Sequence, residues 1–201
     1  MLIINRENST KEGRYMAAIS LIRMGHPTLR KIAQLVTLTE LESSEFKTLL
    51  ANLYDTMKVE GGIGIAAPQI NISKQVALIE LPQKSERYGT LQESGLFIII
   101  NPQITIIEHE LQGFWEGCLS LPGLRGFVER PKIVQIDYLN EQGIKKTFVA
   151  ENFLAAVFQH ELDHLFGKLY IDQITDTTKL SYIEEFTEFN AINKKEDLNI
   201  E

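Results

Sequence analysis

The stretch that decides the fold is QHELDHLFG, residues 159–167. It places two of the chain's four histidines, His160 and His164, four residues apart, with Glu161 directly after the first. On a helix, positions i and i+4 lie one turn apart on the same face, so both imidazoles can reach one point in space. Glu161 lies beside that face and can reach a water molecule held there. This HExxH pattern predicts a helix that carries two metal ligands and a general base.

The residues before the motif indicate that this helix faces the protein core. Phe153, Val157, His160 and His164 follow one another at helical spacing, so the histidines continue an apolar stripe. Buried histidines need partners, which favours a metal site over the alternative of a solvated helix face with two histidines by chance. The sequence therefore predicts a buried helix over residues 151–167 that ends at Gly167.

The rest of the chain predicts an α+β fold in which small antiparallel β-sheets pack around a central helix carrying HExxH, with a further C-terminal helix. The segment 39–61 has apolar residues at helical spacing and predicts one long amphipathic helix. Short β-branched runs and a turn at residues 140–143 predict strands at 75–81, 96–101 and 103–115 and a hairpin over 132–150.

Patterning also divides the chain into three parts. Residues 1–15 are poorly patterned and predict a flexible N-terminal extension. Residues 16–176 form the expected catalytic domain. Residues 177–201 are acidic and predict a C-terminal helix to about Asn190, followed by a frayed tail.

Composition excludes several classes of protein. With a formal net charge of −7 and no basic run, strong nucleic-acid binding is not expected. There is no run of 18 apolar residues, so no membrane span is expected. The chain has one cysteine, which cannot form an intramolecular disulfide, and this favours a cytoplasmic location.

A catalytic divalent metal usually has three protein ligands, and the histidine pair supplies only two. The single cysteine, Cys118, lies in WEGCLSLPG, residues 115–123. A thiolate is a strong ligand, although a lone cysteine is also a common small core residue. Cys118 is therefore the candidate third ligand, with core packing as the alternative.

Three segments together resemble the peptide deformylase family. They are GIGIAAPQ at 62–69, EGCLS at 116–120 and QHELDH at 159–164, and their order and spacing are those of the family. The resemblance covers residues 18–175. It implies an enzyme that hydrolyses the formyl group from the N-terminal methionine of nascent polypeptides and releases formate.

The resemblance also implies the chemical roles. Cys118, His160 and His164 would hold one divalent metal ion, with Fe²⁺ as the expected ion and Zn²⁺, Ni²⁺ or Co²⁺ as alternatives in the purified protein. Glu161 would be the general acid and base, while Gln69 and Leu119 would stabilise the oxyanion.

A wider group of residues is expected to bind the substrate. Gly62 and Gly64 permit close approach of a peptide backbone, which could pair along this segment like an added strand. Apolar residues near the metal would form the methionine pocket, with core packing as their alternative. The expected substrate-binding residues are Gly62, Ile63, Gly64, Phe114, Glu116, Gly117, Arg125, Phe153, Ala156 and Val157.

Two arginines, Arg125 and Arg130, follow the segment that contains Cys118. A solvated surface position is the default for Arg125 and Arg130. The resemblance implies that Arg125 lies at the mouth of the cleft and that one of the two pairs with Glu116.

Other functions remain as hypotheses. An HExxH metallopeptidase acting on internal bonds would need a third ligand after His164, where no histidine follows. A catalytically silent metal-binding homologue would more readily have lost Glu161 or Gln69. The expected partners are N-formylmethionyl peptides, and a transient ribosome contact through the C-terminal helix stays open.

Overall fold

The structure is a computed structural model that describes residues 18–81, 84–85, 89–90 and 95–190. Its predicted N-terminal extension, residues 1–15, lies outside the described residues. Within the described part, no helix combines the length and the apolar character that crossing a membrane requires.

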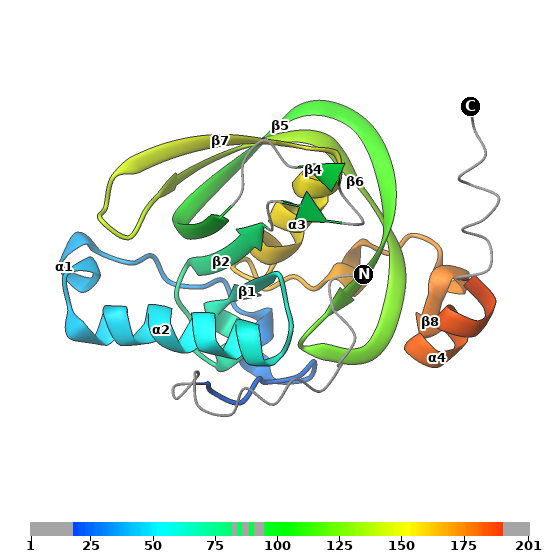
Figure 1. The fold of residues 1–201 in the computed structure, drawn as a ribbon, viewed down its shortest axis with the longest axis horizontal. Helices are drawn as coiled ribbons and strands as arrows, with labels where there is room; N and C mark the ends of the chain where they lie inside the picture. Colours follow the sequence, from blue (N-terminus) through cyan, green and yellow to red (C-terminus); the bar gives the residue numbers. More distant parts are fainter. Residues whose placement is uncertain (1–17, 82–83, 86–88, 91–94, 191–201) are drawn as a thin grey trace.

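Strands and helices combine in one α+β arrangement, as predicted (Figure 1). The main sheet has six antiparallel strands in the order β1-β2-β5-β6-β7, with β8 also paired to β6. A separate two-stranded sheet contains β3 and β4. The strand bounds are β1 Gly64–Ala66, β2 Val76–Leu81, β3 Lys84–Ser85, β4 Gly89–Thr90, β5 Gly95–Cys118, β6 Leu121–Leu139, β7 Lys145–Glu151 and β8 Leu180–Tyr182.

The helices are few, and most are short. The α-helices are α1 Leu38–Leu41, α2 Ser44–Val59, α3 Asn152–Asp163 and α4 Ile183–Glu185, and a π-helical turn over Phe186–Asn190 continues α4. Short 3₁₀ turns occupy Pro27–Arg30, Ala67–Ile70, Tyr170–Gln173 and Thr177–Lys179.

Helix α3 lies inside the curve that the long strands β5 and β6 make (Figure 1). Its apolar side packs on the sheet in a cluster that includes Val157, Phe158 and Leu162, all at most 2% exposed. Helix α2 packs on β1 and β2 through a second cluster that includes Leu53 and Met57. The helix expected over residues 151–167 is shorter in the structure, because α3 ends at Asp163 and His164 is its C-cap. Burial of apolar surface such as this contributes about 25 cal/mol per Å².

The predicted single helix over residues 39–61 is in fact two helices. Ser43 separates them, because its hydroxyl donates to the carbonyl of Glu40 in α1 and accepts from the backbone N–H of Phe46 in α2. Ser43 therefore ends one helix and caps the next. Gly61, with φ of 69°, ends α2 in the left-handed conformation that glycine adopts readily.

The predicted strands at 96–101 and 103–115 are one continuous strand, β5. Asn101 has φ of 51°, and the pairing of β5 with β6 shifts in register between Ile100 and Gln103. The Asn101 side chain bonds both the N–H and the carbonyl of Val36, which holds this irregularity. The breaker residues therefore mark a β-bulge within a strand and do not end it.

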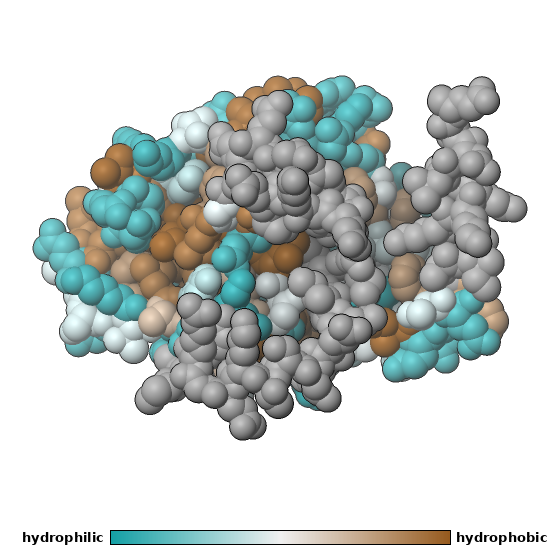
Figure 2. Space-filling view, in the orientation of Figure 1, coloured by the Kyte–Doolittle hydropathy of each residue, from teal (hydrophilic) through white to brown (hydrophobic). Residues whose placement is uncertain are grey.

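The hairpin over 132–150 is confirmed as the pairing of β6 with β7. The C-terminal helix begins only at Ile183, later than predicted, because residues 180–182 pair with β6 as strand β8. On the surface, hydrophobic residues gather mainly in the region between α2 and β7 (Figure 2).

Candidate metal centre and active site

Cys118, His160 and His164 converge in the interior, as the sequence predicts. Their donor atoms all lie within 4.8 Å of one another, and Cys118 Sγ is 3.3 Å from His164 Nε2. Cys118 is the last residue of β5, while the two histidines occupy the end of α3 and its C-cap. All three are at most 3% exposed. A thiol and two imidazoles form the three-ligand set typical of a catalytic divalent metal, so these residues fit the ion that the motif implies.

Glu116 orients the first histidine. Its carboxylate accepts a hydrogen bond from His160 Nδ1 at 2.7 Å, which leaves the lone pair of Nε2 free for a metal. Arg130 donates to both Glu116 oxygens, at 2.6 and 3.1 Å, and to Asp163 at 2.8 Å. Burial alone would raise the pKa of Glu116, but the His160 hydrogen bond and the Arg130 charge outweigh it and lower that pKa to about 2. The carboxylate therefore stays ionised beside His160.

Glu161 lines a small pocket together with Cys118 and His160, two of the metal-ligand candidates. The carboxyl is 4% exposed, and its Oε2 has no hydrogen-bond partner among the described residues. Burial raises the pKa of Glu161 to about 7. A carboxyl group with a pKa near neutrality can both accept and return a proton. The lining residues are Gly64, Gln69, Gly117, Cys118, Leu119, His160 and Glu161.

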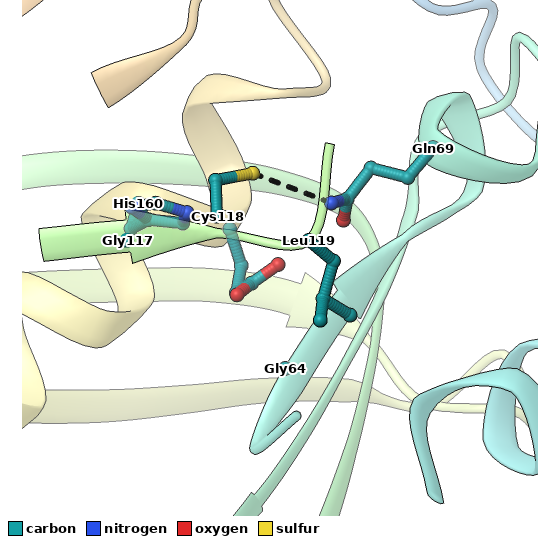
Figure 3. A pocket seen from close by; sticks show the side chains of 7 residues that line it. Gly64, Gln69, Gly117, Cys118, Leu119 and His160 are labelled. Atoms are coloured by element: carbon teal, nitrogen blue, oxygen red, sulfur yellow. Dashed lines mark hydrogen bonds between the residues drawn. The ribbon is translucent and has the colours of Figure 1, made fainter. Parts of the chain in front are cut away.

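Gln69 reaches the same pocket from the 3₁₀ turn after β1. Its Oε1 accepts from the Ala66 N–H at 2.8 Å, and its Nε2 lies 3.3 Å from Ser120 Oγ. Nε2 also lies 3.5 Å from Cys118 Sγ, the contact drawn as a dashed line in Figure 3. Leu119 lines the pocket beside it. The structure thus brings together Gln69, Leu119 and the ligand candidates.

The glycines expected near the substrate pack closely against side chains of the site. Gly64 and Gly117 line the pocket. A Cβ at Gly64 would stand 2.4 Å from Glu161 Oε1, so a side chain there would displace the carboxylate. Gly62 lies against Leu119, with 3.1 Å from an added Cβ to Leu119 Cδ1.

The predicted methionine-pocket residues lie apart from the pocket lining. Val157 belongs to the core cluster of α3, and Phe153 packs against that cluster. Ile63, expected instead to pair with the peptide backbone, packs against the same cluster. Phe114 meets Phe153 edge to face at a ring-centroid distance of 5.4 Å. Ala156 is 3% exposed.

Arg125 is buried, whereas a solvated surface position was expected. It is 0% exposed, so the solvated position is wrong. Its guanidinium lies against Gly117, where an added Cβ would be 2.1 Å from Nη1, and Nη1 donates to the Leu124 carbonyl. Arg130, also buried, is the arginine that pairs with Glu116. The pairing of β5 with β6 turns both arginines inward, which sequence spacing alone does not reveal.

Three residues near the site were not anticipated. Asp163 supports Arg130, Ser120 bonds Gln69, and the Tyr170 ring stacks on His160 at 5.9 Å between centroids. Ser120 lies within the EGCLS segment, which could have drawn attention to it. Tyr170 carries no local signal, because its contact forms only when the chain after α3 folds back.

Comparison with known proteins agrees with this geometry. The family described as polypeptide deformylase matches residues 19–180. A peptide deformylase of Leptospira biflexa is 38% identical over 170 residues, covering 85% of this chain and 95% of the relative. One from Fusobacterium nucleatum is 42% identical over 157 residues, covering 78% and 84%.

Solved structures give the same result. The Met-Ala-Ser-bound crystal structure of a class I type b peptide deformylase from Acinetobacter baumannii has a TM-score of 0.71 and 35% identity, covering 78% of this chain and 98% of that one. The peptide deformylase of Thermotoga maritima has a TM-score of 0.69 and 34% identity, covering 79% and 99%. The chain belongs to the polypeptide deformylase family.

Proposed function

We propose that this protein hydrolyses the formyl group from the N-terminal methionine of nascent polypeptides and releases formate. The observation that carries the proposal is the convergence of the Cys118, His160 and His164 donor atoms, with Glu161 in the pocket that Cys118 and His160 line. Family membership supports the same reaction.

Cys118, His160 and His164 are the proposed ligands of one divalent ion. When bound there, such an ion would supply Lewis-acid activation of water and of the formyl carbonyl. Fe²⁺ is the proposed ion because the family resemblance implies it, while the thiolate and imidazole donors would also accept Zn²⁺, Ni²⁺ or Co²⁺. Metal analysis of protein purified without oxygen tests this, and a native ion other than iron would contradict it.

Glu161 is the proposed general base and acid. Its carboxylate takes a proton from the attacking water as the water oxygen bonds to the formyl carbon. The same carboxyl then gives that proton to the methionine nitrogen as the C–N bond breaks, leaving formate and a free amine. The pKa of about 7 suits both steps near neutral pH.

Gln69 and Leu119 are the proposed oxyanion donors, through the side-chain amide and the backbone N–H. Each such donor contributes on the order of 3 kcal/mol to transition-state stabilisation in comparable sites.

The remaining proposed substrate-binding residues are those that the family resemblance implies. Gly62, Ile63 and Gly64 would receive the peptide backbone as an added strand. Gly117, Glu116 and Arg125 would shape the floor near Cys118. The methionine side chain would lie near Phe114, Phe153, Ala156 and Val157.

A formate-release assay on formyl-Met-Ala-Ser tests the function. We expect turnover by the wild-type protein and none on blocked peptides with only internal bonds, which an HExxH metallopeptidase would cleave. Glu161→Gln should keep the fold and the metal while lowering kcat by at least about 100-fold, since it cannot accept the proton.

Glu151→Gln is the matched control, because this exposed glutamate precedes the same helix and lies outside the pocket. It should retain wild-type kcat. Full activity of Glu161→Gln, or no formate from the wild type, would refute the mechanism or the function respectively.

The proposed substrates emerge at the ribosome, so we place the activity in the cytoplasm with transient ribosome contact. Co-sedimentation with ribosomes at low salt tests the contact. A chain that stays entirely in the supernatant would exclude it.

A further inference from the structure

The side-chain amide of Gln69 is held at both of its polar atoms. Oε1 faces the Ala66 N–H at 2.8 Å, and Nε2 faces Ser120 Oγ at 3.3 Å and Cys118 Sγ at 3.5 Å. Gln69 is 2% exposed and Ser120 is 0% exposed, so water cannot easily replace these contacts.

The Ala66 contact determines which way the amide points. A backbone N–H can only donate, so the atom facing Ala66 must be the oxygen. The amino group therefore lies on the other side, toward Ser120 and Cys118. It carries two hydrogens, and the two neighbours on that side can each receive one.

Ser120 is placed to hold only one of these hydrogens. It lies in the turn between β5 and β6, directly after Leu119. Its carbonyl accepts from the Met24 N–H at 2.9 Å, and the Gln69 carbonyl accepts from the Ile22 N–H at 2.9 Å. One N-terminal segment thus fixes the backbones of Ser120 and Gln69 beside each other.

We propose that Ser120 is a positioning residue for Gln69. Its hydroxyl oxygen accepts one amide hydrogen, so the other stays on the side of Cys118 Sγ, in the pocket where the formyl oxygen gains negative charge. Without the Ser120 hydroxyl, the Ala66 bond and the long contact to Cys118 Sγ remain, and the amide plane could turn about Oε1 so that the donor loses its direction. The inference rests on the proposed function, in which Gln69 is an oxyanion donor.

A double-mutant cycle tests this role, with Ser120→Ala, Gln69→Ala and the double variant. We expect Ser120→Ala to lower kcat about 10-fold, less than the 100-fold or more that removing an oxyanion donor costs. KM for formyl-Met-Ala-Ser should change by less than about 3-fold, because the loss is confined to the transition state. In the Gln69→Ala background, Ser120→Ala should change kcat by no more than about 2-fold.

Binding gives a second readout. The tripeptide Met-Ala-Ser has no formyl oxygen, so its Kd should be the same for wild type and Ser120→Ala. Melting temperature and metal content are measured for each variant. If Ser120→Ala is unfolded at the assay temperature, the cycle is run with Ser120→Cys, whose thiol is a weak acceptor and should give the same pattern.

Ser43→Ala is the matched control, because it removes a hydroxyl that accepts a hydrogen bond far from the pocket. It should lower stability and leave kcat unchanged. Equal kcat for wild type and Ser120→Ala, or an equal loss in both Gln69 backgrounds, would overturn the role of Ser120 alone. A wild type that releases no formate would overturn the proposed function as well.

Discussion

At the scale of single residues, Gly64 and Glu161 depend on each other. The carboxylate occupies the space where any larger residue at position 64 would place its Cβ. A hydrogen side chain at Gly64 therefore leaves Glu161 free to project into the pocket. This is a steric requirement, since the backbone at Gly64 is an ordinary strand.

Gly64→Ala should therefore displace the Glu161 carboxylate. We expect kcat for formate release to fall about 100-fold, the cost of misplacing a catalytic group by about 1 Å. The measurement is steady-state kinetics on metal-loaded protein whose fold is checked by circular dichroism.

Gly113→Ala provides the control for steric overlap. Its added Cβ would lie 2.1 Å from the Phe127 ring, outside the pocket lining. It should cost about 1–3 kcal/mol of stability and leave kcat intact. A folded Gly64→Ala variant with wild-type kcat would contradict the steric argument.

At the scale of elements, Arg130 ties together β5, β6 and α3. From β6 it bonds Glu116 on β5 and Asp163 at the end of α3. The side chains of Arg130 and Glu116 are 5% and 4% exposed, so neither charge is hydrated if the other is removed. These ion pairs therefore hold β5, which carries Cys118, in a fixed position relative to α3, which carries His160.

Arg130→Met should leave the buried Glu116 carboxylate without its arginine partner. We expect the free energy of unfolding to fall by about 3–5 kcal/mol, as found when one partner of a buried pair is removed. Urea denaturation measures this change. Lys132→Ala breaks an ion pair to Glu110 whose side chains are 36% and 60% exposed, and should cost at most about 1 kcal/mol. Equal losses for both variants would refute the distinction.

At the scale of the whole molecule, the metal would join segments that are distant in the chain. Cys118 is the last residue of β5, and the two histidines lie at the C-terminal end of α3. An ion bound by all three residues would therefore link β5 to α3 in the folded state only. Ligand binding of this kind stabilises by about 2.7 kcal/mol when the free ion is at 100 times its Kd.

Removing the metal should therefore lower the melting temperature of the wild-type protein. Thermal unfolding with and without a chelator measures the shift. Cys118→Ala should show little metal-dependent shift, whereas the exposed His109→Ala should keep all of it. An identical melting temperature in both conditions for the wild type would argue against a bound ion.

The placement of His160, His164 and Glu161 could be predicted because helical periodicity is local. Four residues make one turn, whatever the helix packs against. The same reasoning failed at Ser43, where a capping hydroxyl divides a helix whose apolar spacing continues. It also failed at Asn101, where a residue typical of turns makes a bulge inside β5.

The sequence by itself determined the motif helix, its buried face and the residue types that can hold a metal. Only the tertiary structure decided that Arg130 pairs with Glu116, that Arg125 lies buried against Gly117, and that Gln69 bonds Ser120. These contacts cross between β5, β6, α3 and the turn after β1. Which residues meet in these contacts depends on the pairing register of β5 with β6 and on where the chain runs after each element. The spacing of neighbouring residues in the sequence specifies neither.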